Sequence, residues 1–146
     1  MDVAQNSASG VTRLHRLQPL RVLLSGRDRR FLRVTSFLLA QRGYDVQESS
    51  PRKTLETAER HRSDVVLLET NDSRVMAARK VAALQALPTA PSVLVVFDDK
   101  NEEEMDRWKG LAAVTKWTPI ENLVEQVEAA ALARPSPLTE IERAYR

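Results

Sequence analysis

Charged side chains placed just after short apolar runs are the residues of this sequence best positioned to do chemistry. Asp28, Glu69 and Lys116 each follow such a run within a few residues. Phosphoryl transfer to a carboxylate relies on a divalent cation, and Mg²⁺ prefers carboxylate oxygens as ligands. The paired carboxylates Asp98 and Asp99 open a run of acids, for which solvation is the ordinary explanation. Because sites in a parallel sheet form at the carboxyl ends of the strands, the candidate positions are those just after each run, at 25–28, 69–71, 97–99 and 115–117.

The composition excludes most other chemistries. The absence of cysteine removes disulfides, thiolate metal sites and cysteine nucleophiles. Two histidines, His15 and His61, are too few for a histidine-rich metal site, and neither has a matched serine for a triad. No glycine-rich phosphate loop occurs. We expect no enzymatic activity, metal or cofactor.

Net charge and hydropathy restrict the partners in the same way. A formal net charge of +2 is too small to argue for nucleic acid. No apolar run approaches the roughly 18 residues that a membrane helix needs, and the first residues lack the pattern of a secretory signal. We therefore expect a cytoplasmic protein that binds neither nucleic acid nor membrane.

The apolar runs at 22–24, 65–68 and 93–96 predict strands that are covered on both faces, which is typical of a parallel sheet. Residues 44–46 predict a weak second strand, and residues 112–114 predict a short fifth strand. Helical spacing predicts core stripes between the strands, made of Phe31, Val34 and Leu38, of Val75, Ala78 and Ala82 with Val81 and Leu84 beside them, and of Ile120, Leu123, Val124, Val127 and Ala131.

Helix boundaries agree with this alternation. Gly43 predicts the end of the first helix, Ser50 and Pro51 predict the start of the second, and Gly110 predicts the end of a helix that contains Met105 and Trp108. Five β-α repeats predict an α/β fold with a doubly wound, five-stranded parallel sheet. We expect a flexible lead at 1–20, this domain at 21–134, and a tail or short helix at 135–146.

Residues 21–132, about three quarters of the chain, resemble the CheY-like receiver domain of bacterial response regulators, a flavodoxin-like (βα)5 fold. The order and spacing of four segments carry the resemblance, namely Arg21-Val22-Leu23-Leu24, the passage from Leu39 to Val46, the strand from Ser63 to Glu69, and Val114-Thr115-Lys116.

Most of the family's functional residues are replaced. The two acidic residues that help to hold Mg²⁺ in the family correspond here to Gly26 and Arg27. The phosphoacceptor aspartate corresponds to Glu69, and the hydroxyl residue after the fourth strand corresponds to Phe97. Only the lysine is kept, as Lys116. The resemblance therefore implies a degenerate receiver, or pseudo-receiver.

These replacements act together against metal binding. Gly26 removes a ligand oxygen, and Arg27 places a cation near the expected metal position. Two like unit charges about 4 Å apart repel by roughly 4 kcal/mol at an effective dielectric constant of 20, and a divalent ion doubles that repulsion. The alternative is a phospho-accepting regulator that uses Glu69 or Asp28 in an unusual site.

Glu69 has two interpretations. Its extra methylene could carry the carboxylate toward Lys116 and imitate a phosphorylated aspartate. It could instead be a structural anion that Arg27 and Lys116 neutralise. Under either interpretation we expect both cations within ion-pair reach of Glu69, and the missing hydroxyl at Phe97 favours the structural interpretation.

The charges are unevenly distributed. Five arginines occur between residues 21 and 33 beside one acid, Asp28, whereas residues 98–106 hold six acids and Lys100. These are either solvated helix faces or a surface that steers a partner. A further alternative is a small-ligand sensor, with an anion pocket where Arg27 and Arg29 meet the start of the first helix.

Trp108 and Trp117 are candidate interface residues, because aromatic anchors are frequent hot spots. In the resembled family the surface of the fourth helix, fifth strand and fifth helix is the usual dimer and output face. We therefore predict a phosphorylation-independent protein-interaction module of bacterial signalling. Its partner would be a kinase, effector or scaffold, and a homodimer would form through that face.

Overall fold

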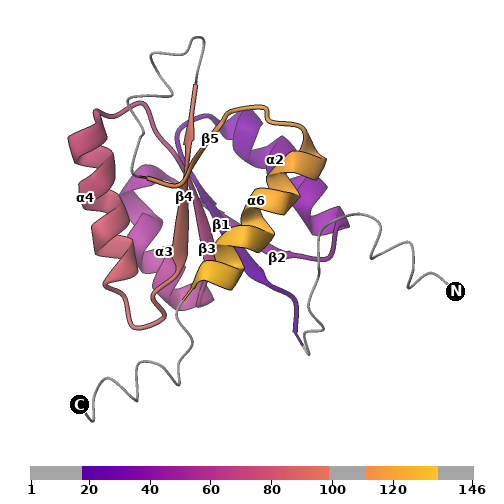
Figure 1. The fold of residues 1–146 in the computed structure, drawn as a ribbon, viewed down its shortest axis with the longest axis horizontal. Helices are drawn as coiled ribbons and strands as arrows, with labels where there is room; N and C mark the ends of the chain where they lie inside the picture. Colours follow the sequence, from indigo (N-terminus) through magenta and orange to yellow (C-terminus); the bar gives the residue numbers. More distant parts are fainter. Residues whose placement is uncertain (1–17, 99–110, 135–146) are drawn as a thin grey trace, which may run out of the picture.

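The computed structural model describes residues 18–98 and 111–134 (Figure 1). Within them, one five-stranded parallel sheet has the order β2-β1-β3-β4-β5. Its strands are β1 (Arg21–Ser25), β2 (Asp45–Ser49), β3 (Val65–Glu69), β4 (Ser92–Phe97) and β5 (Ala113–Thr115). This strand order is that of flavodoxin-like sheets, in which ligands bind where the order reverses, here between β1 and β3.

Helices connect the strands as the alternating pattern predicts. They are α2 (Arg29–Gln41), the 3-10 turn η1 (Pro51–Lys53) with α3 (Thr54–His61), α4 (Arg74–Gln85) and α6 (Ile120–Ala133). The predicted α/β fold with a doubly wound parallel sheet is thus confirmed. The predicted helix with Met105 and Trp108 lies outside the described residues, as do the N-terminal 1–17 and C-terminal 135–146 segments.

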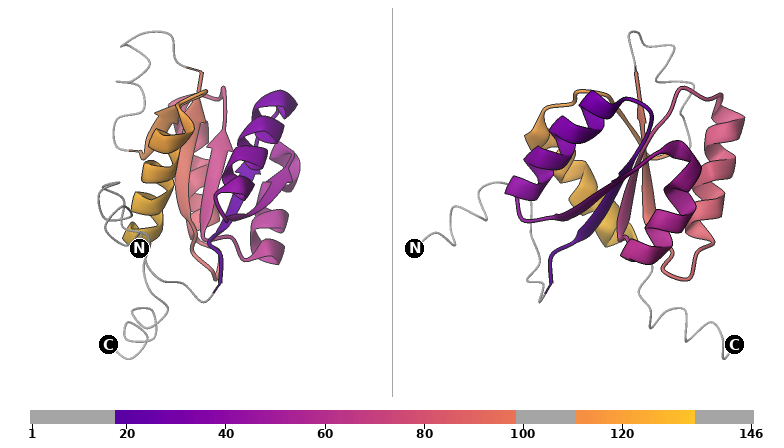
Figure 2. Two further views of the ribbon diagram at one scale, coloured as in Figure 1. Left: turned by 90° about the vertical axis from the view of Figure 1, so that its right-hand side faces the viewer. Right: turned by 180° about the vertical axis from the view of Figure 1, so that it is seen from behind.

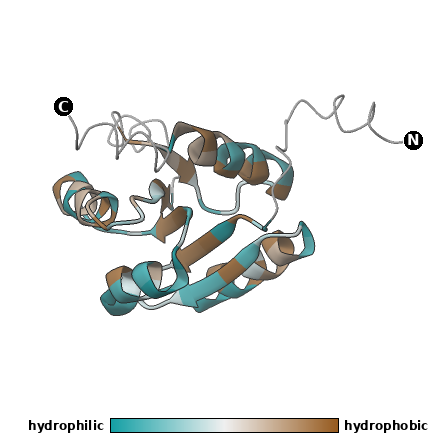
Figure 3. Ribbon diagram, turned by 90° about the horizontal axis from the view of Figure 1, so that it is seen from below, coloured by the Kyte–Doolittle hydropathy of each residue, from teal (hydrophilic) through white to brown (hydrophobic). Residues whose placement is uncertain are grey.

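The sheet separates two apolar cores, and the two-residue period of the strands assigns side chains to them alternately. Helices α2 and α6 cover one face, while α3 and α4 cover the other (Figures 1 and 2). Leu24, Leu67 and Val96 point to the first core, whereas Leu23 and Val95 point to the second. Apolar residues therefore fill the central strands β1, β3 and β4 and the inner helix faces, whereas the edge strand β2 and the outer helix faces are mainly polar (Figure 3).

Local signals set the ends of the helices. The Asp28 carboxylate caps α2 by accepting a hydrogen bond of 3.1 Å from the Phe31 N–H. Gly43 follows the end of α2 with a φ of +92°, a backbone conformation that favours glycine, which confirms the predicted helix end. Within the described residues, no helix is long and apolar enough to cross a bilayer.

Two of the three predicted core stripes are wrong in register. On α2 the buried residues are Phe31, Leu32, Thr35 and Leu39, and Val34 remains 40% exposed. On α4 the buried residues are Ala77, Val81 and Leu84, and Val75 is 60% exposed. Both helices carry apolar residues on two adjacent faces, so spacing alone cannot show which face is covered. The α6 stripe is correct, with Leu123, Val124 and Val127 buried.

Candidate functional site

The candidate site lies at the carboxyl ends of the strands, where the β1–α2 loop meets the ends of β3 and β5. Glu69 is the last residue of β3, and Lys116 directly follows β5. Gly26, Arg27 and Asp28 form the loop after β1. Because β1 and β3 are adjacent parallel strands, residues 42 or so positions apart in sequence are brought into direct contact.

The Glu69 carboxylate points into the protein and is held by three donors. Its Oε1 accepts hydrogen bonds from the backbone N–H groups of Arg27 at 2.8 Å and Asp28 at 3.3 Å. Its Oε2 lies 3.5 Å from the Lys116 Nζ, and the side chain is only 4% exposed. The Glu69 carboxylate is therefore held in a fixed position, with hydrogen bonds to one oxygen and an ion pair to the other.

Lys116 is shared between two carboxylates. Its Nζ lies 2.9 Å from Asp28 Oδ2 and 3.5 Å from Glu69 Oε2. Burial alone would lower the pKa of Lys116, but the Asp28 hydrogen bond and the charges of Glu69 and Asp28 raise it above its usual value. The ammonium group thus occupies the space between the two carboxylates as a permanent cation.

Asp28 has two structural functions that the sequence interpretation did not assign to it. It caps α2, and it forms the closer of the two ion pairs of Lys116. The hydrogen bonds from Lys116 and from the Phe31 N–H lower the pKa of Asp28. Its position directly before an amphipathic helix was the signal for the cap, whereas nothing in the sequence indicated the ion pair.

Gly26 makes room for Glu69. A Cβ atom at position 26 would lie 2.7 Å from Glu69 Cβ and closer still to its Oε1. Real Cβ atoms do not approach other heavy atoms so closely, and the conflict involves the root of the side chain as well as its tip. Glycine at position 26 and glutamate at position 69 are thus sterically matched.

The expected ion pair between Arg27 and Glu69 is not formed, whereas the expected pair between Lys116 and Glu69 is. Arg27 binds Glu69 through its backbone N–H, and its guanidinium makes no salt bridge to that carboxylate among the described residues. Arg27 is exposed, and its charge adds to the lowering of the pKa of Asp72 that is caused mainly by Lys80. The Arg27 guanidinium therefore lies at the exposed edge of the site, where its charge influences Asp72.

The structure does not bring the remaining predicted positions together into one site. Phe97 packs into the core under α3 and α4, and offers no hydroxyl to the Glu69 carboxylate. The anion pocket expected at the start of the first helix already has an occupant, because the N–H groups of Arg27 and Asp28 donate to Glu69. Trp108 lies outside the described residues.

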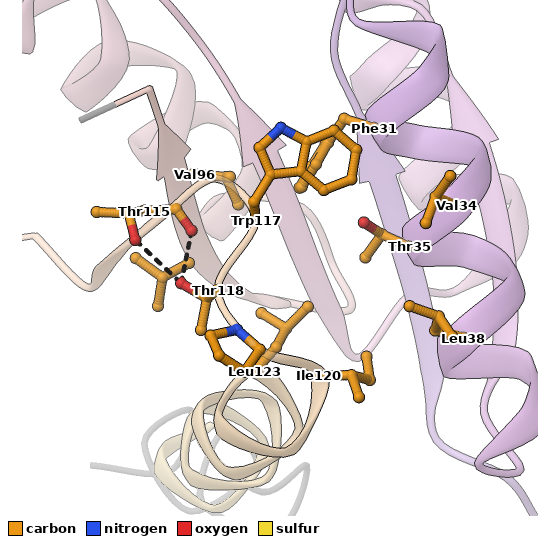
Figure 4. Close-up of a pocket in the computed structure, with 12 residues that line it drawn as sticks. Phe31, Val34, Thr35, Leu38, Val96, Thr115, Trp117, Thr118, Ile120 and Leu123 are labelled. Atoms are coloured by element: carbon orange, nitrogen blue, oxygen red, sulfur yellow. Dashed lines mark hydrogen bonds between the residues drawn. The ribbon is translucent and has the colours of Figure 1, made fainter. Parts of the chain in front are cut away.

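Trp117 connects the charged site to an apolar groove between α2 and α6 (Figure 4). It has a φ of +64°, which is unusual for a bulky residue, and the residue is 51% exposed. Its indole meets the Phe31 ring edge-to-face, with ring centroids 5.3 Å apart. The Lys116 Nζ lies 5.8 Å from the centre of the same Phe31 ring. Phe31 therefore touches both the cation and the exposed aromatic side chain.

The groove has a volume of about 210 Å³ and is lined mainly by apolar side chains. Val34 and Leu38 of α2 face Ile120 and Leu123 across it (Figure 4). The α2 stripe that was predicted to be buried in the core therefore forms one wall of this open groove.

The arrangement is better suited to holding the Glu69 carboxylate in place than to binding a metal ion. Within residues 18–98 and 111–134, no group of three or more histidine, cysteine, aspartate or glutamate side chains is placed to hold a metal. Lys116 neutralises the two carboxylates, Asp28 and Glu69, that a divalent cation would need. The groups brought together can fix a loop and a helix start in one conformation.

The sequence matches no protein-family model and no curated protein. Solved structures match over most of the chain. A CheY-like response regulator receiver domain protein from Methanospirillum hungatei JF-1 is 17% identical, with a TM-score of 0.64 over 86% of this chain and 99% of that chain. The chemotaxis protein CheY4 of Vibrio cholerae is 20% identical, with a TM-score of 0.58 over 77% and 98%.

A third match is a response regulator from Desulfuromonas acetoxidans, which is 16% identical with a TM-score of 0.60 over 75% of this chain and 94% of that chain. At these identities the likeness concerns the fold. The chain therefore has the fold of CheY-like response regulator receiver domains.

Proposed function

We propose that this chain is a non-enzymatic receiver module of bacterial cytoplasmic signalling that binds a protein partner independently of phosphorylation. One observation carries the proposal: the Glu69 carboxylate is already seated on two backbone N–H groups and Lys116. A receiver that switches needs an acceptor carboxylate free to gain and lose a phosphoryl group. Here the side chain at that position is part of the packed structure.

The charge balance of the site supports this proposal. Phosphorylation of Glu69 would replace its carboxylate charge of −1 by an acyl phosphate that carries about −1.5 to −2 charges, next to Asp28. Lys116, already paired with both carboxylates, would be left to neutralise this charge. Without a divalent cation the added repulsion is uncompensated, so phosphorylation of Glu69 is disfavoured.

We infer that Glu69 is a fixed structural anion and not a functional mimic of phosphoaspartate. The contact with Lys116 fits both interpretations. The position of Phe97 in the opposite core favours the structural one, because no side-chain hydroxyl there can follow the state of the carboxylate. The site would then hold one conformation permanently.

The groove beside Trp117 is the surface that we propose for partner binding. Val34 and Trp117 expose apolar area at its rim, and α2 carries Arg29, Arg30 and Arg33 without any acid. Such a surface fits a segment that presents apolar side chains flanked by acidic ones. Binding through the face that includes the predicted fourth helix, as in a homodimer, stays a prediction.

Partner binding can be tested with two substitutions in this surface. We expect Trp117→Ala to weaken the affinity of a captured partner by roughly 30-fold, the effect of losing an interface hot spot of about 2 kcal/mol. Arg33→Glu should slow association, most strongly at low salt. Both can be measured by affinity capture from the native host, followed by binding kinetics with the purified partner.

Val75→Ala is the matched control, because Val75 is 60% exposed, similar to Trp117 at 51%, but lies on α4, across the sheet. The proposal predicts unchanged binding for this variant, and the same affinity with or without acetyl phosphate and Mg²⁺. Partner binding that requires acetyl phosphate, or that survives both groove substitutions, would refute it.

A further inference from the structure

A second cavity lies at the opposite end of the sheet, at the amino-terminal ends of the strands. It has a volume of about 350 Å³, and Arg21, Arg62, Asp64, Thr89 and Arg134 contribute to its lining. These residues come from the start of β1, the turns before β3 and β4, and the end of α6. The cavity is separate from the Glu69 site, and neither depends on the other.

The lining has a surplus of positive charge. Three arginines face one carboxylate, Asp64, and both oxygens of that carboxylate are already engaged. Asp64 Oδ2 accepts a hydrogen bond of 2.8 Å from the Arg21 backbone N–H, and its Oδ1 pairs with the Arg134 guanidinium. Asp64 therefore neutralises the Arg134 guanidinium. The Arg21 guanidinium lies 3.9 Å from Asp45 Oδ2 and donates a hydrogen bond to the His61 carbonyl.

Arg62 supplies the unneutralised charge. Within the described part of the chain, its guanidinium makes no hydrogen bond or salt bridge. Arg62 ends α3 in the left-handed conformation, with φ 54° and ψ 50°. Glycine is the usual residue at such a helix end, because a side chain there is strained. An arginine that bears this strain at the wall of a cavity suggests that its side chain has a use.

Thr89 provides a second group without a partner. Its hydroxyl oxygen is buried and makes no hydrogen bond to any of the residues that the structure describes. Its carbonyl, by contrast, accepts a hydrogen bond of 3.2 Å from the Arg134 Nε. The next residue, Ala90, also has a positive φ, of 42°. Two strained turns thus meet at this cavity, and each contributes a polar group whose hydrogen-bonding capacity is unused.

We propose that this cavity binds a small molecule through a phosphate group. Guanidinium groups match the geometry of phosphate oxygens, and a hydroxyl can donate to a third oxygen. Arg62 would bind the phosphate with support from Arg21, while the Thr89 hydroxyl would donate to it. The volume exceeds what a bare phosphate ion fills and is within the range of small-ligand pockets. The site would let the module respond to a metabolite without using Glu69.

Inorganic phosphate is the probe for this proposal, with sodium chloride at equal ionic strength as the reference. In the full chain we expect saturable amide shifts in NMR spectra at Arg62, Thr89 and Arg134. Arg62→Gly should weaken phosphate binding at least about tenfold, as expected for the loss of a charged hydrogen bond. Thr89→Val should weaken it less.

The same glycine variant separates binding from folding. Because glycine relieves the left-handed strain, Arg62→Gly should melt about 3 °C higher than the parent chain in the absence of phosphate. Arg60→Ala removes a nearby exposed arginine of α3 and should leave phosphate binding unchanged. Three results would each overturn the proposal. The first is phosphate binding that Arg62→Gly leaves intact, and the second is amide shifts confined to Arg27 and Asp28. The third is amide shifts with phosphate that are no larger than those with chloride.

Discussion

Lys116→Met will lower the free energy of unfolding by about 3 kcal/mol, because it leaves two carboxylates facing each other without a cation. The Lys116 Nζ is the shared partner of Asp28 at 2.9 Å and Glu69 at 3.5 Å. Removal of one member of a buried ion pair costs about 3–5 kcal/mol. We place the loss at the lower end because Asp28 is about one-third exposed and water screens part of its charge. Urea unfolding at pH 7 measures the difference.

Lys80→Met is the control for this substitution. Lys80 also pairs with an aspartate, Asp72, but both side chains are more than one-third exposed. Pairs of this kind contribute about 0–1 kcal/mol, so this variant should unfold almost like the parent chain. Equal losses for the two lysine variants would show that Lys116 is an ordinary surface cation and not the centre of the site.

Lowering the pH should reduce the difference in the free energy of unfolding between the Lys116→Met variant and the parent chain. The pKa of Asp28 is lowered in the folded protein from its usual value of 3.8. Its pairing with Lys116 therefore stabilises the fold above that value and is lost as the pH falls through the lowered pKa. Once Asp28 is protonated, the parent chain loses the advantage that Lys116 provides at pH 7.

Gly26→Ala will destabilise the protein by about 2 kcal/mol, although it adds only one methyl group. The new Cβ would lie 2.7 Å from Glu69 Cβ, so the glutamate must leave the N–H groups of Arg27 and Asp28. Overpacking of a filled interior costs about 1–3 kcal/mol. Urea unfolding of the single variants and of the double variant with Glu69→Ala measures the coupling between the two positions.

The double-mutant cycle is decisive because the clash exists only while Glu69 is present. In the Glu69→Ala background, Gly26→Ala should cost almost nothing, which gives a coupling energy of about 2 kcal/mol. Arg27→Ala is the matched control in the same loop, since Glu69 is bound by the Arg27 backbone and not by its side chain. Additive effects at positions 26 and 69 would contradict the steric match.

The fold was predictable because three of its strands, β1, β3 and β4, carry an unambiguous signal. Val65 to Leu68 and Val93 to Val96 are fully apolar runs, and only strands covered on both faces need them. The buried faces of the helices were harder to predict. On α2, Val34 and Leu38 form as regular a stripe as Leu32, Thr35 and Leu39. The register was decided by the packing of α2 beside α6, which the sequence does not display.

The site was predictable only in part. The family resemblance marked positions 26 and 69 as changed, and each replacement taken alone looked like a lost function. Their steric match depends on the register of β1 against β3, which brings together residues 43 positions apart in the sequence. The same limit applies to Arg27, whose backbone binds Glu69 while its side chain turns away. Neither effect leaves a pattern in local composition or spacing.

We propose that the Glu69 site does not accept a phosphoryl group. The most direct test is intact-mass spectrometry of the full chain after incubation with Mg²⁺ and acetyl phosphate. An aspartate-containing receiver domain in the same reaction shows that the reagent works. The seated carboxylate predicts no added mass on this chain, and a gain of one phosphoryl group on Glu69 or Asp28 would contradict the claim.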